Sequence, residues 1–158
     1  NEKRILCQSP PVVTYDLKPE MSALEIRDAV VNSILKNKFD FICVNFANPD
    51  MVGHTGDFNA AIKACETVDN CTNKIVSEGM KKGYSVIIIA DHGNCEKMKN
   101  SDGTPNTAHT TNPVPIILVE KEKRKIISGI LANVAPTILE IMGIEKPNEM
   151  DEKSLLSN

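Results

Sequence analysis

The 158-residue sequence predicts an α/β fold in which a mostly parallel sheet is flanked by helices. Two observations predict it. Short, uncharged runs rich in β-branched residues are typical of buried strands, and they alternate along the chain with amphipathic helical patterns. No internal repeat or linker divides the sequence, so we expect one domain. In a sheet of this kind the crossovers are right-handed, and ligands bind beyond the carboxyl ends of the strands.

The first half of the chain contains two predicted strands and one predicted helix. Apolar residues 4–7 indicate a strand, which a Ser-Pro-Pro sequence at 9–11 ends. Ser22 opens a capping-box sequence, and the apolar spacing after it predicts a helix that ends near Lys36. Residues 39–46 (FDFICVNF) form a largely continuous apolar run, which is typical of a strand buried on both faces.

The second half predicts two helices and two further strands. A long helical pattern covers residues 57–82, and Gly83 supplies the glycine that commonly follows a helix C-terminus. Residues 84–90 (YSVIIIA) give the clearest strand, because they are β-branched and uncharged, and residues 115–119 (PIILV) give another. A short helix is expected over residues 135–142.

Composition excludes several classes of protein. The net charge of −3 and the pI near 5.6 argue against nucleic acid or anionic lipid as a partner. No signal peptide is visible, and no run approaches the roughly 18 apolar residues of a membrane span. Five cysteines without a Cys-x-x-Cys pair argue against a disulfide framework or a zinc ribbon, so Cys43, Cys65 and Cys71 are expected as reduced, buried thiols.

All three histidines lie in loops near the predicted strand ends. Asp50 and His54 are four residues apart, so one helical turn places them on the same face, where they can share a cation. Asp91 and His92 follow the strand at 84–90, and as neighbours in an extended chain they need not serve the same ion. His109 lies in a third loop. Each pair alone also fits a helix cap or a surface turn, but the three together favour a metal site.

The donor types indicate what such a site binds. Carboxylate with imidazole, and no thiolate, suits Mn²⁺, Zn²⁺ or a similar ion. Five candidate ligands exceed the three of a typical catalytic zinc site, so we infer two neighbouring ions, an arrangement suited to phosphoryl transfer. The sequence has no glycine-rich phosphate loop and no Gly-x-Ser-x-Gly nucleophile motif.

Several segments in series resemble one enzyme family and together extend over essentially the whole chain. The segments that carry this resemblance are residues 9–22, 48–54, 90–94, 107–115, 135–137 and 147–150. In this order they closely resemble the C-terminal part of the cofactor-independent (2,3-bisphosphoglycerate-independent) phosphoglycerate mutase family, within the wider alkaline phosphatase superfamily.

The resemblance implies an alkaline-phosphatase-like core and a glycolytic isomerase that interconverts 3-phosphoglycerate and 2-phosphoglycerate through a metal-activated phosphoserine. It implies two divalent ions, with Mn²⁺ expected. The first ion would be held by Asp50, His54 and His109. The second would be held by Asp91 and His92, together with an aspartate and the nucleophilic serine from an N-terminal part. It also implies a cytoplasmic, monomeric enzyme with a small-molecule substrate and no nucleic-acid or membrane partner.

The sequence departs from the family in what it lacks. The N-terminal aspartate motif, the nucleophile motif Asn-Ser-Glu-x-Gly-His and the transferase domain that grips the substrate are not found in residues 1–158. We therefore expect the C-terminal part of the phosphatase-like domain, with an incomplete core, no catalytic nucleophile, no mutase activity alone and weak binding of the second ion. The absence of an initiator Met fits that expectation. Pro11, Asp151 and Glu152 replace the residues usual in the family.

Two other functions stay open. One is a related metallophosphomutase or phosphatase of the same superfamily, although residues 14–22 and the Asn-Pro-Asp50 sequence favour the mutase. The other is a non-catalytic module that binds a metal or a partner through the same residues.

Overall fold

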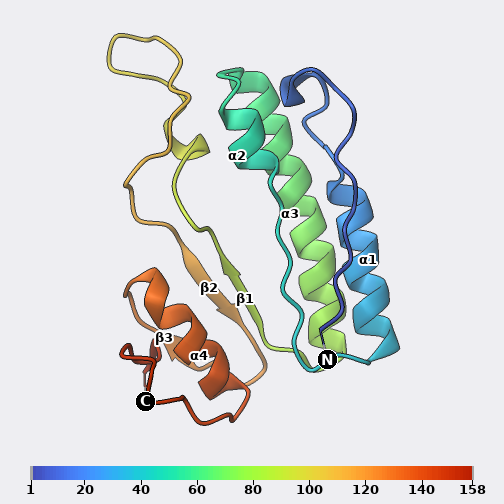
Figure 1. The fold of residues 1–158 in the computed structure, drawn as a ribbon, viewed down its shortest axis with the longest axis vertical. Coiled ribbons are helices and arrows are strands. Elements are labelled where there is room, and N and C mark those ends of the chain that lie inside the picture. Colours follow the sequence, from blue (N-terminus) through green and yellow to red (C-terminus); the bar gives the residue numbers. More distant parts are fainter. Residues whose placement is uncertain (1, 158) are drawn as a thin grey trace.

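The computed structural model of the protein describes residues 2–157, and Figure 1 shows a helical group beside a smaller group of strands and one helix. Helices α1 and α3 pack side by side, and α2 packs on α3. The helices are α1 (Ala23–Lys36), α2 (Asn48–Gly53), α3 (Phe58–Lys81) and α4 (Val134–Ile141); the strands are β1 (Val86–Ile89), β2 (Ile116–Val119), β3 (Lys125–Ile126) and β4 (Leu156–Ser157); and the short 3-10 turns are η1 (Tyr15–Leu17), η2 (Cys95–Lys97) and η3 (Leu131–Asn133).

Three predicted helices are confirmed as α1, α3 and α4, with ends that differ from the prediction by about one residue. Their ends depend on local chemistry. Asp57 caps α3 by accepting a hydrogen bond from the Ala60 amide at 2.8 Å, and Gly83 after it takes a left-handed φ of 83°. The capping box at Ser22 is wrong, because this hydroxyl instead donates to the Gln8 carbonyl and ties the N-terminal segment to the start of α1.

The α/β class is confirmed, but the parallel strand pairing is wrong for residues 2–157. The strands predicted at 84–90 and 115–119 form β1 and β2, which pair antiparallel with Val86 opposite Val119, and β3 pairs antiparallel with β4. A parallel pair needs a crossover connection, usually a helix. Between β1 and β2 the described chain contains only the short turn η2, so it returns in the opposite direction.

The strands predicted at residues 4–7 and 39–46 do not form in the described chain. Figure 1 shows both segments as extended chains that run along the helical group. Residues from both segments line a hollow of about 400 Å³ against α1. Ile42 and Phe46 pack on the α1–α3 core, whereas the Phe41 side chain is 54% exposed. A strand requires a bonded neighbour as well as a suitable sequence, and residues 2–157 supply none for these two segments.

Two small apolar clusters form the core of the helical group. One holds α1 against α3, and the other lies directly under the loops described below. Alanines on α3 let α2 approach closely, so the second cluster fixes the position of α2. The α1–α3 cluster is built on Val30, Ile34 and Ile75, and the cluster under α2 is built on Val52, Ala60, Ala61, Ala64 and Met98.

The chain exposes much more surface than a compact domain of its size. Its accessible surface is 10632 Å², whereas about 7,800 Å² is expected for a compact monomer of 17.3 kDa. Large apolar side chains contribute to the excess, including Leu6 at 81% and Val13 at 93% exposure. None of the helices in the described part of the chain is long and apolar enough to cross a membrane.

All five cysteines are free thiols, as predicted. Cys71 is buried as expected, but the prediction is wrong for Cys43 and Cys65, which are exposed. Cys43 lies on the unpaired extended segment, and Cys65 lies on α3, where its side chain interacts with Cys95 of the turn η2.

Candidate metal centre

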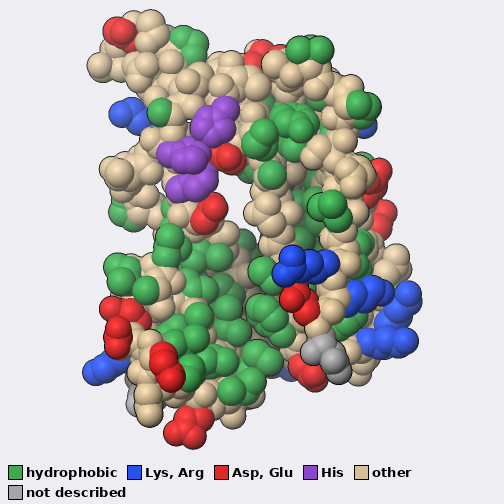
Figure 2. Space-filling view, viewed as in Figure 1, with side chains coloured by type: hydrophobic (Ala, Val, Ile, Leu, Met, Phe, Trp, Pro, Cys, Tyr) green, Lys and Arg blue, Asp and Glu red, His purple; other side chains and the backbone are tan. Residues whose placement is uncertain are grey.

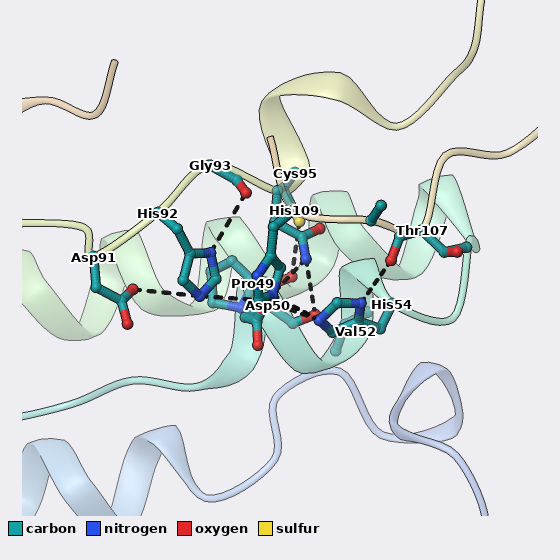
Figure 3. A network of polar contacts seen from close by, with 12 residues as sticks. Pro49, Asp50, Val52, His54, Asp91, His92, Gly93, Cys95, Thr107 and His109 are labelled. Atoms are coloured by element: carbon teal, nitrogen blue, oxygen red, sulfur yellow. Dashed lines mark hydrogen bonds and ion pairs between the residues drawn. The ribbon is translucent and has the colours of Figure 1, made fainter. Parts of the chain in front are cut away.

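Helix α2 and two loops bring the candidate ligands together around one carboxylate oxygen (Figure 3). Asp50 lies in the first turn of α2 and His54 directly follows that helix, so the predicted helical turn places both on one face. The Asp50 Oδ1 atom lies 3.1 Å from His54 Nε2, 3.0 Å from His109 Nε2 and 3.8 Å from His92 Nε2. All three histidines therefore direct the same ring nitrogen at one point.

Within this set, the ligating atoms of Asp50, His92 and His109 all lie within 4.8 Å of one another. The rings of His92 and His109 stack with centroids 3.7 Å apart. Asp91 lies at the margin: its Oδ1 is 3.7 Å from His92 Nε2, but its side chain is 86% exposed. His92 thus contacts both carboxylates, and the division of the ligands between two ions stays a prediction.

The partner of His54 fixes which of its nitrogens is free. His54 Nδ1 lies 2.6 Å from the Thr107 carbonyl oxygen, which can only accept, so Nδ1 carries a proton and, in the neutral ring, Nε2 presents a lone pair. That lone pair faces His109 Nε2 at 3.0 Å and the Asp50 carboxylate. Acceptors crowded in this way repel one another unless a proton or a cation lies among them. The donor set and its orientation therefore fit a divalent ion.

Asn94 orients the Asp50 carboxylate. Its amide donates from Nδ2 to Asp50 Oδ1 at 2.9 Å, and the residue is 6% exposed. The side chain lies against Gly53, where a Cβ atom would overlap Asn94 Oδ1. That oxygen is buried and has no hydrogen-bond partner among residues 2–157. Gly53 therefore makes room for the group that holds Asp50 in place.

Two contributors to the site are absent from the sequence-based prediction. Thr107 acts through its backbone carbonyl, which no side-chain pattern can reveal. Asn94 follows the Asp91-His92 pair closely, so proximity to that motif was a possible indication, but asparagine after a strand is also common in turns. Cys95 is not in the ligand group, because its thiol donates to the Pro49 carbonyl.

The candidate centre borders open space. In Figure 2 the histidines lie at the rim of an opening between the two groups of elements. A hollow of about 780 Å³ extends from Asp91 and His92 along residues 110–116 to residues 126–131. The ligand group is therefore reachable from solvent or by another segment of protein.

Comparison with known proteins places this geometry in a family. A family model described as the metalloenzyme superfamily matches residues 1–146. A 2,3-bisphosphoglycerate-independent phosphoglycerate mutase of Flavobacterium johnsoniae is 60% identical over 155 residues, which cover 98% of this chain and 31% of that protein. The protein of the same name from Parabacteroides distasonis is 55% identical over 157 residues, which cover 99% of this chain and 31% of that protein.

The fold has a solved counterpart. A crystal structure of Leishmania mexicana phosphoglycerate mutase, described as obtained at low cobalt concentration, superposes with a TM-score of 0.85 at 30% identity. The superposition covers 94% of this chain and 30% of that chain. The chain thus spans about a third of the length of the curated relatives and of the structure that it matches.

Proposed function

Because this chain belongs to the metalloenzyme superfamily, we propose that it is the metal-binding part of a 2,3-bisphosphoglycerate-independent phosphoglycerate mutase. Such an enzyme is an isomerase that interconverts 3-phosphoglycerate and 2-phosphoglycerate. One observation carries the proposal: Asp50 and the three histidines converge on one point in a chain that is 60% identical to a mutase of this name.

Two divalent ions are proposed for the complete site, with Mn²⁺ as the expected metal. Asp50, His54 and His109 would hold the first ion, and Asp91 and His92 would help to hold the second. The cobalt named for the related Leishmania mexicana structure supports a divalent ion. When bound, such ions neutralise negative charge on a phosphoryl group during its transfer.

This chain's own residues prepare the ligands for that role. The Thr107 carbonyl keeps the proton of His54 on Nδ1, so that the lone pair of Nε2 remains free to bind a metal ion. Asn94 holds one oxygen of Asp50 in a fixed orientation. The nucleophile motif that the resemblance implies is not found in residues 1–158, so we propose that the phosphoserine nucleophile is supplied from outside this chain. We therefore expect no mutase activity from the chain alone.

We also propose the type of substrate, the oligomeric state and the compartment of the enzyme. The acidic pI near 5.6 favours a small-molecule substrate over nucleic acid or an anionic membrane. A monomeric enzyme in the cytoplasm completes the proposal, and the five free thiols are compatible with a reducing compartment.

A hybrid enzyme tests the proposed activity. The segment of the Flavobacterium johnsoniae mutase that aligns with this chain is replaced by residues 1–158, and 3-phosphoglycerate turnover is measured with Mn²⁺. We expect the hybrid to turn over 3-phosphoglycerate. The Asp50→Ala hybrid should turn it over at least about 100-fold more slowly, and the chain alone should show no turnover.

Other outcomes separate the alternatives. Hydrolysis of phosphate esters without isomerisation would favour the related phosphatase. A folded hybrid that binds Mn²⁺ but transforms no phosphate ester would favour the non-catalytic module. Turnover of 3-phosphoglycerate by the isolated chain would contradict the assignment of the nucleophile to a segment outside it.

A further inference from the structure

The Glu96 carboxylate links the two loops that carry His92 and His109. Its Oε2 atom accepts a hydrogen bond from the backbone N–H of Asn94 at 2.6 Å. Its Oε1 atom accepts from the Thr110 hydroxyl and from Asn112 Nδ2, the latter at 2.9 Å. Glu96 lies on η2, whereas Thr110 and Asn112 belong to the loop that follows His109. The Glu96 side chain thus contacts residues that lie 14 and 16 positions further along the chain.

The bonds from Thr110 and from the Asn94 backbone end close to proposed metal ligands. Thr110 directly follows His109, and its amide donates to the Gly93 carbonyl at 2.9 Å, next to His92. Asn94, whose amide Glu96 holds, donates its own side chain to Asp50. Gly93 has no room for a side chain, because a Cβ atom there would overlap Thr110 Oγ1 and lie 2.6 Å from Glu96 Oε1. The contact between the loops is therefore close as well as polar.

We propose that Glu96 is a positioning residue, whose carboxylate clamps residues 91–97 to residues 107–112 and so holds His92, His109 and Asp50 in one ligand group. This inference rests on the proposed metal centre. Glu96 is not itself in the ligand group of Asp50, His92 and His109. Both of its carboxylate oxygens already accept hydrogen bonds from residues outside that group, so its proposed role is to set the positions of other side chains.

The chemistry of the clamp requires a carboxylate. Two oxygens accept from three donors, and the hydrogen bonds from Thr110 and then Asn112 lower the pKa of Glu96, against the opposing effect of burial. A glutamine keeps the size but has one acceptor oxygen, and its NH₂ group faces a donor. An aspartate keeps the charge but is one methylene shorter.

Calorimetric titration of the full chain with Mn²⁺ tests the clamp. We expect Glu96→Gln to weaken Mn²⁺ binding by about 10- to 100-fold, the usual effect of losing an outer-sphere partner. Thr110→Val removes one donor without changing the charge, so it too should weaken binding. Asp102→Asn is the matched control: Asp102 accepts from the Thr104 amide and hydroxyl in the same way, but in a separate turn that contacts no ligand. Its affinity should stay within about twofold of the original.

The metal-free protein separates the clamp from the metal centre. Without Glu96 the amides of Asn94 and Thr110 should exchange their hydrogens at least about tenfold faster, while those of α1 exchange at the original rate. Faster exchange supports the clamp even if the original chain binds no Mn²⁺, a result that would refute the proposed metal centre alone. Unchanged exchange, or equal Mn²⁺ affinity in the Glu96→Gln and original chains, would overturn the clamp.

Discussion

At the scale of single residues, the site depends on groups that fix the orientation of the ligands. The Thr107 carbonyl determines which nitrogen of His54 faces Asp50, although the two residues are 53 positions apart. Asn94 and Gly53 form a similar pair, because the absent side chain of one makes space for the amide of the other. A substitution at such a position is expected to reorient a proposed ligand without removing it.

Gly53→Ala tests this packing. The new Cβ would overlap Asn94 Oδ1 and lie 3.0 Å from Cys95 Sγ, and Asn94 is too buried to move freely. We expect the free energy of unfolding, measured in urea, to fall by about 1–3 kcal/mol, and Mn²⁺ binding to weaken. Gly79→Ala is the matched control in α3, since its nearest neighbour would be at an ordinary 3.5 Å and alanine favours a helix. Equal stability of the two variants would contradict the account.

A second test at this scale concerns the thiols of Cys65 and Cys95. When Cys65 is a thiolate, the Cys95 thiol can donate to it instead of to the Pro49 carbonyl, and this side-chain hydrogen bond lowers the pKa of Cys65 to about 7, although burial opposes the shift. A lowered pKa favours the thiolate, so alkylation of Cys65 should reach half its maximal rate near pH 7 and fall as the pH falls below it. In Cys95→Ala the midpoint should move up toward the ordinary value of 9.0.

Mass spectrometry of the Cys65 peptide after iodoacetamide treatment gives this rate. Cys43→Ala serves as the control and should leave the midpoint for Cys65 unchanged. A midpoint that is the same with and without the Cys95 thiol would show that the contact does not govern Cys65.

Sequence patterns predict the members of the candidate site better than the contacts that support them. The proposed ligands Asp50, His54, Asp91 and His92 are recognisable because each lies beside a predicted strand end. The roles of Thr107, Asn94 and Glu96 depend on which loops meet in space. That meeting follows from tertiary packing and has no periodicity along the chain.

At the scale of elements, the helices follow their local sequence closely. The ends of α3 are set by the Asp57 side chain and by Gly83, so the pattern alone is sufficient to place them. Strands are different, because each needs a hydrogen-bonded neighbouring strand that lies far away in the sequence or outside the described residues. Residues 39–46 have a strand-like sequence but no bonded neighbour among residues 2–157, which is why the predicted strand does not form.

The cap of α3 provides a test at this scale. Asp57→Ala removes the acceptor for the Ala60 amide and should lower the free energy of unfolding by about 1 kcal/mol. Asp69→Ala, in the exposed middle of the same helix, should leave stability within about 0.5 kcal/mol of the original. Urea unfolding followed by circular dichroism measures both. A larger loss for Asp69→Ala than for Asp57→Ala would contradict the capping role.

At the scale of the whole molecule, the surface is larger than a compact domain requires, and it includes strongly exposed large apolar side chains. The accessible surface exceeds that of a compact monomer by roughly 2,800 Å². The unpaired segment at 39–46 and the exposed Leu6 and Phe41 belong to this excess. We expect the remainder of a mutase-sized protein to cover it and to pair with these segments, as relatives about three times longer would allow.

Phe41 tests this expectation in two contexts. In the isolated chain its side chain is 54% exposed, so Phe41→Ala should change the free energy of unfolding by less than about 0.5 kcal/mol. In the hybrid with the Flavobacterium johnsoniae mutase, where we expect Phe41 to be buried, the same change should cost about 3 kcal/mol. Equal small losses in both proteins would contradict burial of this segment by the rest of the enzyme.

Calorimetric titration of the chain with Mn²⁺ measures whether the cluster around Asp50 is a metal centre. We expect one tight ion and one weak ion. Asp50→Asn should abolish the tight binding, because Asp50 is the carboxylate on which all three histidines converge. Asp91→Asn should spare the tight ion and remove only the weak one. Absence of binding, two equally tight ions, or unchanged tight binding in Asp50→Asn would contradict the assignment of this cluster as the metal centre.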